Sequence, residues 1–217
     1  MEKTQHRIAI LADGDFPRCE QPLKALREAD FVVCCDGAYR AAATCLDGSG
    51  FVVVGDGDSL SLSEKQALGS RFVHVAEQDY NDLHKAVGWA VEAFSTLNLR
   101  LTILGATGRR EDHTLGNIAY LATFADEYPG IDIEMLTDHG RMRYVSGTCT
   151  LPSFPRQQVS FFALDPTQPV TATGLRWPLQ GRTLSRWWQG TLNEALGDTI
   201  TIDAAQLIVF QTYDPKV

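Results

Sequence analysis

The 217-residue chain lacks the sequence features of secreted, membrane and nucleic-acid-binding proteins. Its five cysteines are an odd number without a CxxC pair, so we expect no disulfide framework. No apolar run approaches the ~18 residues of a membrane helix, and the first, residues 8–12, ends too early for a signal peptide. Lys and Arg number 19 against 27 Asp and Glu, which argues against a nucleic-acid-binding face. We therefore expect a reduced, cytoplasmic protein without a membrane or nucleic-acid partner.

The remaining composition is that of an ordinary globular chain. Hydrophobic residues make up 44% and charged residues 21%, which excludes a disordered or collagen-like protein. A chain of this length buries roughly 70% of its unfolded surface, so it needs no disulfide or metal merely to fold. The formal net charge of −8 poses a question, because an acidic protein binds a phosphate compound only if something offsets the repulsion.

Short apolar runs alternate with amphipathic segments over the first two-thirds of the chain. The short runs are residues 7–12, 31–35, 51–54, 71–75, 100–104 and 131–136. Several are apolar throughout, as are strands buried on both faces of a parallel sheet. Helical spacing covers residues 79–97 and 113–127, and Ser61 with Glu64 forms a capping box for a short helix that ends near Gly69. This alternation predicts βαβ units and a doubly wound parallel sheet, an α/β fold.

The pattern changes after about residue 138. Helical periodicity disappears, and residues 141–163 and 198–213 have the pattern of short strands separated by Gly and Pro. We predict an α/β domain over residues 1–138 and a small antiparallel β-sandwich over residues 139–217. Since so short a β domain is marginally stable alone, we expect it to be stabilised by packing against the first domain, against a second copy of the chain, or against both.

Carboxylates and glycines follow each of the first five predicted strands. The segments are Asp13-Gly14-Asp15, Asp36-Gly37-Ala38, Gly55-Asp56-Gly57-Asp58-Ser59, Gln78-Asp79 with Asp82, and Gly105-Ala106-Thr107-Gly108 with Asp112-His113. The carboxyl ends of parallel strands share one edge of the sheet, and ligands of open α/β sheets bind there. We therefore expect these five segments to face one site.

Each segment taken singly has a plainer explanation. Gly and Asp are the commonest turn residues, and Asp79 could serve only as a helix N-cap. Turns alone explain less well why Asp56, Asp58, Asp82 and Asp112 should converge. Two carboxylates ~4 Å apart repel by about 4 kcal/mol at an effective dielectric of about 20. A divalent metal removes that cost, and Mg²⁺ prefers oxygen ligands together with phosphates. The sequence therefore favours a metal-phosphate site.

The segment 105–108 suits phosphates, because glycines let backbone N–H groups approach closely at a helix start. It lacks the Lys-Ser/Thr of a P-loop. Lys85, Arg109 and Arg110 stand near these loops and could contact phosphate oxygens, although Arg110 is equally well explained as a solvated charge. His113 is more often structural at a helix start than a general base, and the histidines show no zinc-ligand spacing.

These motifs, in this order, resemble the thiamine pyrophosphokinase family. Residues 36–40 are similar to its DGGAN-type segment, residues 55–59 to GDxDS, residues 78–82 with Lys85 to QDxTDxxK, residues 105–114 to GATGGRxDHT, and residues 174–179 and 190–194 to GLxWxL and GxSNE. The match spans nearly the whole chain. The motifs are modest singly but specific together.

The resemblance implies a nucleotide-binding α/β half, a β-sandwich, and a homodimer with active sites at the subunit interface. The reaction it implies is transfer of diphosphate from ATP to the thiamine hydroxyl, which gives thiamine diphosphate and AMP. Such a transfer is catalysed mainly by positioning and charge neutralisation.

By the same resemblance, the catalytic residues Asp56, Asp58 and Asp82 would hold Mg²⁺ and the transferring phosphates. Asp82 could also orient or deprotonate the hydroxyl. On the thiamine side, Gln78 would hydrogen-bond to the pyrimidine, Trp177 would stack on it, and Asn193 would contribute to binding. The residues assigned to ATP are Asp36, Gly37, Lys85, Gly105, Ala106, Thr107, Gly108, Arg109, Asp112 and His113. We expect Trp187 and Trp188 to lie in the core.

The chain departs from the family pattern at four places. The segment after Asp36 is shortened, Gly57 replaces a usual Phe, Arg109 replaces the second Gly of a pair, and Leu192 stands where Ser is frequent. The metal-phosphate chemistry is therefore better supported than the acceptor.

Two alternatives remain open. Residues 54–59 superficially resemble the DxDx motif of haloacid-dehalogenase-type phosphatases, which would make the protein a Mg²⁺-dependent phosphohydrolase. That motif normally follows the first strand rather than the third. A non-catalytic nucleotide or thiamine sensor is the other alternative, because Leu192 and the shortened segment after Asp36 depart from the family pattern.

Overall fold

The chain forms two compact units, Met1–Asp138 and His139–Val217. The structure is a computed structural model that describes residues 5–43, 45–46 and 50–215. Within these residues no helix is long and apolar enough to span a membrane.

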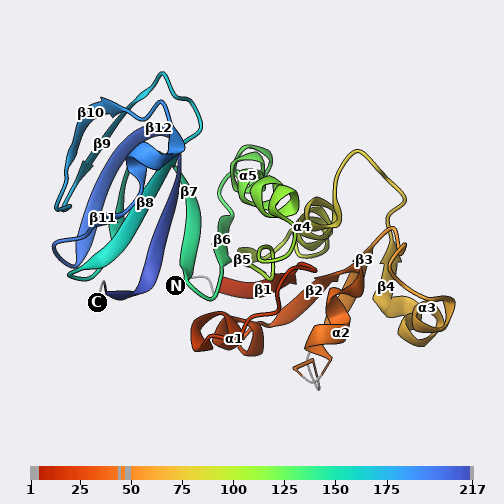
Figure 1. Cartoon of the computed structure of the whole chain (residues 1–217). Helices are drawn as coiled ribbons and strands as arrows, with labels where there is room; N and C mark the ends of the chain where they lie inside the picture. The colour runs from red at the N-terminus through yellow and green to blue at the C-terminus, as the bar shows by residue number, and fades with distance from the viewer. Residues whose placement is uncertain (1–4, 44, 47–49, 216–217) are drawn as a thin grey trace. The chain divides into compact units, whose positions relative to one another are not determined.

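A parallel sheet forms the centre of the N-terminal unit (Figure 1). Its strands are β1 (Gln5–Leu11), β2 (Phe31–Cys35), β3 (Phe51–Gly55), β4 (Phe72–His74), β5 (Asn98–Leu104) and β6 (Asp132–Leu136). They lie in the order β6-β5-β1-β2-β3-β4, and every pair is parallel. The inner strands carry Val, Ile, Leu and Cys that are almost fully buried, which explains their continuously apolar sequences.

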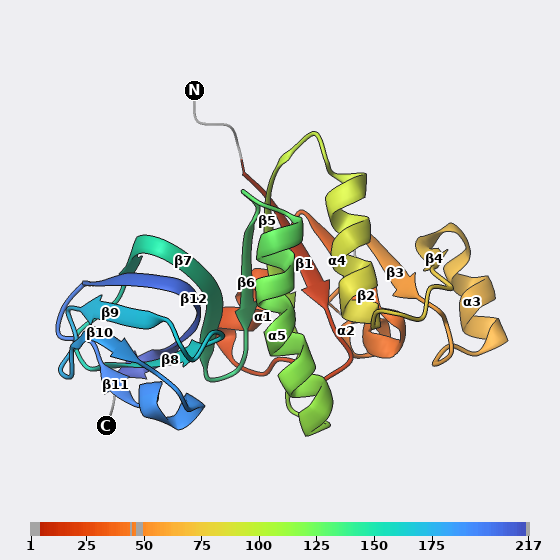
Figure 2. The same cartoon turned by 90° about the horizontal axis from the view of Figure 1, so that it is seen from above.

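Helices cover both faces of this sheet, which confirms the predicted doubly wound fold. They are α1 (Glu20–Arg27), α2 (Tyr39–Ala42), α3 (Leu62–Leu68), α4 (Asp82–Ala93) and α5 (Glu111–Glu127). Figures 1 and 2 show α4 and α5 on one face, with α1 and α2 on the other. The helix α1 is one that the apolar periodicity did not predict, because it is short and buries only Pro22 and Leu26.

The strand order reverses between β1 and β5. The chain runs outward from β1 through β2, β3 and β4, and then returns to form β5 on the other side of β1. The β1 loop (residues 12–15) and the β5 loop (residues 105–110) therefore flank the topological switch point, where open α/β sheets bind ligands.

Backbone hydrogen bonds join these two loops. Ala12 donates to the Leu104 carbonyl at 2.9 Å, Gly14 donates to Gly105 at 2.7 Å, and the Asp15 N–H donates to the Thr107 carbonyl at 2.8 Å. A Cβ on Gly14 would collide with the Gly105 carbonyl, so the close approach requires glycine. The two loops form one continuous wall.

The helix starts near the site differ in how well they could be predicted. The capping box of Ser61 and Glu64 before α3 is confirmed. Asp79 as the N-cap of the next helix is wrong: α4 begins at Asp82, and the Asn81 side chain accepts the His84 N–H at 3.1 Å. An Asn immediately before the helix satisfies the free N–H group that Asp79, placed in the preceding turn, does not reach.

The C-terminal unit consists of antiparallel strands around its own core. They are β7 (Gly140–Pro152), β8 (Gln157–Ala163), β9 (Pro169–Thr173), β10 (Leu179–Thr183), β11 (Asn193–Glu194) and β12 (Thr199–Pro215). The two short strands expected within residues 198–213 are one strand, β12. Its register shifts between Ala204 and Leu207, so its first half pairs with β9 and its second half with β8.

The expectation that Trp187 and Trp188 lie in the core is wrong. Their exposed fractions are 52% and 72%. They stand on the short 3₁₀ helix η3 (Trp187–Gly190), outside the strands whose alternating side chains fill the interior. Trp187 retains an edge-on contact with Phe162 at a centroid distance of 6.0 Å.

Candidate functional site

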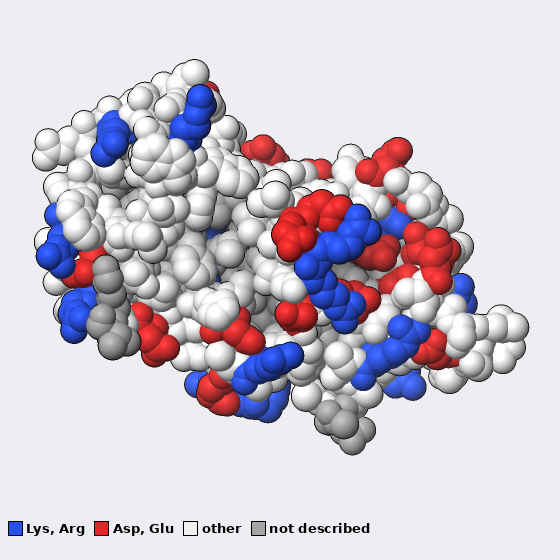
Figure 3. Space-filling model, viewed as in Figure 1, with Lys and Arg blue, Asp and Glu red and all other residues white. Residues whose placement is uncertain are grey.

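A cleft of about 470 Å³ opens at the carboxyl edge of the parallel sheet. Four of the five predicted segments line it directly. The segment Gln78-Asp79 with Asp82 contributes only Asp82. Figure 3 shows acidic and basic side chains gathered together on this unit. The acidic lining residues are Asp13, Asp36, Asp56, Asp58 and Asp82, and the basic ones among the described residues include Arg109 and Arg110.

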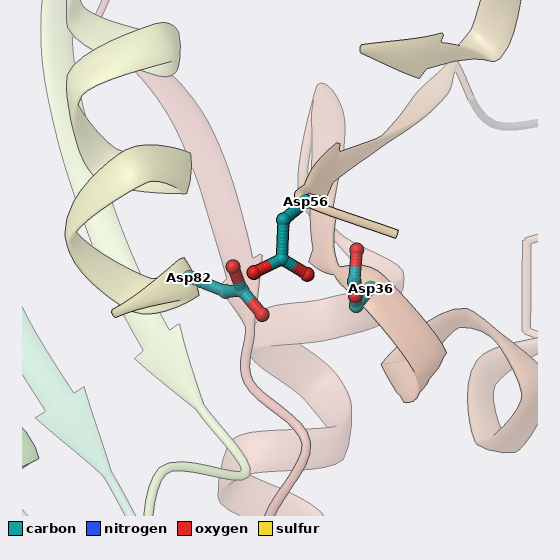
Figure 4. A group of neighbouring side chains, drawn as sticks. All are labelled: Asp36, Asp56 and Asp82. Carbon is teal, nitrogen blue, oxygen red and sulfur yellow. The ribbon is translucent and has the colours of Figure 1, made fainter. Parts of the chain in front are cut away.

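Three carboxylates meet in this cleft. Asp36 follows β2, Asp56 follows β3 and Asp82 begins α4. One oxygen from each lies within 4.8 Å of the others, and Figure 4 shows the three side chains clustered where β3 ends. We call Asp36, Asp56 and Asp82 the carboxylate trio.

The last residue of β3 makes room for the carboxylate trio. A Cβ on Gly55 would collide with the Asp36 carboxylate and would lie 3.2 Å from an Asp82 oxygen. Any larger residue would push these carboxylates apart, so the glycine here serves close approach.

Asp36 is held firmly in an unfavourable environment. Its side chain accepts the Gly57 N–H at 3.1 Å and the Ser59 hydroxyl at 3.4 Å. Its φ of 36° is left-handed, a strained region for a non-glycine residue. Burial, and then the charge of Asp82, raise the pKa of Asp36 above its ordinary value. Holding Asp36 beside other carboxylates therefore lowers the free energy of unfolding, through backbone strain and charge repulsion.

A buried ammonium partly offsets this negative charge. Lys85 Nζ lies 3.3 Å from Asp82 Oδ1 and 3.7 Å from Asp56 Oδ2, and its side chain is 3% exposed. Burial nevertheless raises the pKa of Asp82, against the opposing effect of Lys85. One ammonium facing three carboxylates leaves excess negative charge, and hard oxygen donors in this number are what a divalent cation such as Mg²⁺ takes.

Asp56 is stabilised in its charged form. The Asp58 N–H donates to Asp56 Oδ1 at 3.0 Å, and Gln78 Nε2 donates to Asp56 Oδ2 at 3.1 Å. The Asp58 N–H, followed by Gln78 and Lys85, holds the pKa of Asp56 below its ordinary value. Gln78 thus lies against the carboxylate trio.

In the C-terminal unit, a half-exposed Trp177 is held through its backbone. The Trp177 N–H donates to Asn193 Oδ1 at 3.2 Å, and Asn193 Nδ2 donates to the Trp177 carbonyl at 2.7 Å. The Arg176 guanidinium lies 5.1 Å from the centroid of the Trp177 indole, and Glu194 lies 3.5 Å from Arg176. Asn193 is buried, and both ends of its side-chain amide hold the Trp177 backbone.

Two models of known protein families match this chain. The family model "Thiamin pyrophosphokinase, catalytic domain" matches residues 23–135, and "Thiamin pyrophosphokinase, substrate-binding domain" matches residues 140–210. The chain belongs to the thiamine pyrophosphokinase family. The catalytic-domain match contains the carboxylate trio, and the substrate-binding match contains Trp177 and Asn193.

Individual members of the thiamine pyrophosphokinase family are distant relatives. The chain is 29% identical over an alignment of 156 residues to thiamine pyrophosphokinase 1 of Oryza sativa subsp. japonica; the match covers 62% of this chain and 54% of the rice protein. It is 28% identical over an alignment of 162 residues to thiamine pyrophosphokinase of Bacillus subtilis, and that match covers 66% of this chain and 69% of that protein. The matched region thus spans about half the length of the rice relative.

The fold is shared with solved thiamine pyrophosphokinase structures. The structural match with the crystal structure of the Bacillus subtilis protein covers 97% of this chain and 100% of the Bacillus subtilis chain. Its TM-score is 0.76, at 24% sequence identity. At that identity the match supports the fold.

The structure regroups the carboxylates that the sequence suggested for the metal. Asp36, expected on the nucleotide side, joins Asp56 and Asp82. Asp58 lines the same cleft outside the carboxylate trio. The expected convergence of Asp112 is wrong, because Asp112 is paired with Arg110 at 2.5 Å in the first turn of α5. A loop's position at the edge does not determine which way its side chains point.

The residues expected around the nucleotide divide between two cavities. Ala106, Thr107 and Arg109 line the main cleft, Asp112 lines a neighbouring cavity of about 440 Å³, and His113 lines both. Gly105 and Gly108 shape the β5 loop with φ of 63° and 98°. Gly37 is buried beside Asp36, where a Cβ would lie 3.1 Å from Ser59 Oγ.

Sequence reasoning missed two asparagines of the cleft. Asn117 Nδ2 donates to the Ala106 carbonyl at 2.8 Å, and Asn81 Nδ2 donates to Asn117 Oδ1 at 3.0 Å. They tie the β5 loop to the start of α4. The signal in the sequence is positional: Asn117 stands four residues after His113, on the same helical face.

Proposed function

We propose that this protein transfers diphosphate from ATP to the hydroxyl of thiamine and produces thiamine diphosphate and AMP. The observation that carries the proposal is the carboxylate trio, which lies in a cleft inside the region matched by the family's catalytic domain. The N-terminal unit is proposed to bind the nucleotide and metal, and the C-terminal unit to bind thiamine and to dimerise.

The carboxylate trio would hold Mg²⁺. Its donors are all carboxylate oxygens, two of its members have raised pKa values, and the one buried ammonium beside it offsets only part of the negative charge. Asp58, on the wall of the same cleft, would add a ligand or bind through water. When bound, the ion supplies the positive charge that draws polyphosphate into an acidic protein.

The chain's own residues would then position the reacting groups. The β5 loop and His113 face the phosphates. The thiamine oxygen forms a bond to the β-phosphorus of ATP, the bond from that phosphorus to the oxygen of AMP breaks, and AMP leaves. Asp82, at the start of α4 within the carboxylate trio, is the group proposed to take the hydroxyl proton.

Thiamine recognition is proposed for Trp177 and Gln78. Thiamine carries two flat aromatic rings, a pyrimidine and a cationic thiazolium, and the half-exposed indole of Trp177 offers a stacking surface for the pyrimidine. Gln78 is proposed to share its amide between Asp56 and the pyrimidine. Asn193 would act by fixing the Trp177 backbone. By the family resemblance, we also propose a homodimer with active sites between the subunits. We propose a cytoplasmic location, which agrees with the five free cysteines.

The test is a product assay. Folded protein is incubated with ATP, MgCl₂ and thiamine, and AMP and thiamine diphosphate are quantified by chromatography. We expect equal amounts of both products from wild type, and none from Asp82→Asn or with EDTA. Absence of AMP from folded wild type would overturn the proposal. Phosphate release without thiamine would instead favour a phosphohydrolase, and tight nucleotide binding without turnover would favour a sensor.

A further inference from the structure

An exposed ion pair lines the cleft and is not part of the carboxylate trio. Arg109 Nη1 lies 3.0 Å from Asp13 Oδ1, with side-chain exposures of 56% and 44%. Both residues line the cleft. Asp13 belongs to the β1 loop and Arg109 to the β5 loop, so the pair bridges the two loops at the switch point of the sheet.

The backbone beneath this pair is fixed, whereas its side chains are exposed. The two loops are joined by the hydrogen bonds from Ala12, Gly14 and Asp15 described above. A Cβ on Gly108 would collide with the Asp15 carboxylate, which shows how tightly the loops pack. The ion pair is therefore not needed to hold the loops together, and an exposed pair contributes little stability.

The other basic side chains described at the cleft are more firmly engaged. Lys85 is buried against two members of the carboxylate trio. Arg110 donates to both oxygens of Asp112, at 3.1 and 2.5 Å. Arg109 faces a single exposed carboxylate, so its guanidinium is the one most easily transferred to an incoming anion.

We propose that Asp13 sets the affinity of this cleft for polyphosphates by competing with them for Arg109. In the free protein Asp13 holds the guanidinium on the wall of the cleft. A nucleoside polyphosphate displaces the carboxylate and takes Arg109, because it carries more negative charge than one carboxylate and its oxygens can accept from the guanidinium in bidentate geometry. The inference rests on the proposed function, since it supposes that the cleft binds ATP.

The competition makes the two partners' substitutions act in opposite directions. Asp13→Asn removes the competitor and a repelling charge, and keeps the size of the side chain. Arg109→Gln removes the cation that receives the phosphate. If the pair were instead a brace between the loops, both substitutions would weaken binding and lower Tm together.

The experiment measures dissociation constants by isothermal titration calorimetry with ATP, ADP and AMP, with MgCl₂ present and thiamine left out. For ATP we expect binding roughly twofold to fivefold tighter in Asp13→Asn and about fivefold to tenfold weaker in Arg109→Gln. Both effects should be smaller for AMP, which carries less charge. The matched control is Arg27→Gln, which breaks the exposed Arg27–Glu20 pair on α1 and should leave every affinity unchanged.

The outcomes separate the two claims. Weaker or unchanged ATP binding in Asp13→Asn, or unchanged binding in Arg109→Gln, overturns the competition while leaving the proposed function intact. Failure of folded wild type to bind ATP or ADP overturns the proposed function and the competition with it. Thermal unfolding of each variant checks that it is folded.

Discussion

At the scale of single residues, the site depends on how much room the neighbouring residues leave for the carboxylate trio. Gly55 is the clearest case, because its missing side chain lets the Asp36 and Asp82 carboxylates approach. Asp36 in turn sits in a left-handed conformation, fastened by the Gly57 N–H. Strain and charge repulsion are thus concentrated where the proposed chemistry needs oxygen ligands.

Gly55→Ala should therefore disrupt the site. The added methyl group displaces the Asp36 carboxylate, so we expect activity to fall at least about tenfold, with a loss of about 1–3 kcal/mol in the free energy of unfolding. Steady-state kinetics and urea denaturation measure the two effects. Gly197→Ala is the matched control, because a methyl group added there would meet no atom within 4 Å beyond its chain neighbours, and neither quantity should change. Full activity in Gly55→Ala would contradict this view of the trio.

Asn193→Ala should affect thiamine binding through Trp177. The substitution leaves the Trp177 N–H and carbonyl without their side-chain partner, which costs about 1–3 kcal/mol of unfolding free energy. We expect KM for thiamine to rise while KM for ATP stays unchanged, and the Trp177 amide to exchange hydrogen faster. Unaltered exchange together with a raised KM would mean that Asn193 contacts the substrate directly.

At the scale of elements, the site is assembled by the ends of strands and the starts of helices. The Glu64 carboxylate joins α2 to α3: it accepts hydrogen bonds from Arg40 Nε at 2.6 Å, the Tyr39 hydroxyl at 2.8 Å and the Ser61 N–H at 2.8 Å. This packing keeps the segment after Asp36 against the segment after β3. Arg40 also donates to the Ser59 carbonyl at 2.7 Å.

The Glu64 contacts predict a pH-dependent stability. Hydrogen bonds from Arg40, and then from Ser61, hold the pKa of Glu64 well below its ordinary value. A carboxylate with a lowered folded-state pKa stabilises the fold above its unfolded pKa of about 4.3, and the benefit is lost as the pH falls below it. We expect Glu64→Gln to lower Tm at pH 7, and the gap to wild type to shrink below about pH 4. The exposed Glu92→Gln is the control, and a gap independent of pH would contradict the assignment.

The two buried cysteines of β2 allow a second prediction at this scale. Cys34 and Cys35 lie at the end of β2, both buried. Burial raises the pKa of Cys34 to about 12, and burial also raises the pKa of Cys35. Thiolate, the reactive form, is therefore scarce at pH 8. Native protein should leave both thiols unlabelled by iodoacetamide, as read by mass spectrometry, and guanidinium should expose them. Rapid native labelling of either thiol would show that β2 is less buried than described.

At the scale of the whole molecule, the sequence predicted the edge of the sheet but not the arrangement of side chains on it. Continuous apolar runs such as residues 31–35 identified buried parallel strands, and the loops after them therefore had to share one edge. Loop order does not specify side-chain direction, so it could not show that Asp112 stays outside the carboxylate trio. The assignment of Asp36 to the nucleotide came from the family resemblance, whereas the structure places Asp36 within the trio. The exposure of Trp187 and Trp188 could not be predicted either, because residue type alone favours burial.

The acidic balance of the chain has a local explanation. Part of the net charge of −8 lies in the carboxylate trio, where Lys85 neutralises only one of three charges. Under the proposed function, a cation held by these acidic residues, together with Arg109 on the wall of the cleft, would bind the phosphates. A broad basic surface is not required.

The most direct test of this account is a titration of Mn²⁺ binding followed by electron paramagnetic resonance, without nucleotide. Wild type should bind one ion, and Asp36→Asn, Asp56→Asn and Asp82→Asn should each weaken binding at least about tenfold. Asp112→Asn should bind as wild type does. Equal Mn²⁺ affinity in wild type and the three trio variants would contradict the central claim, as would a loss of binding confined to Asp112→Asn.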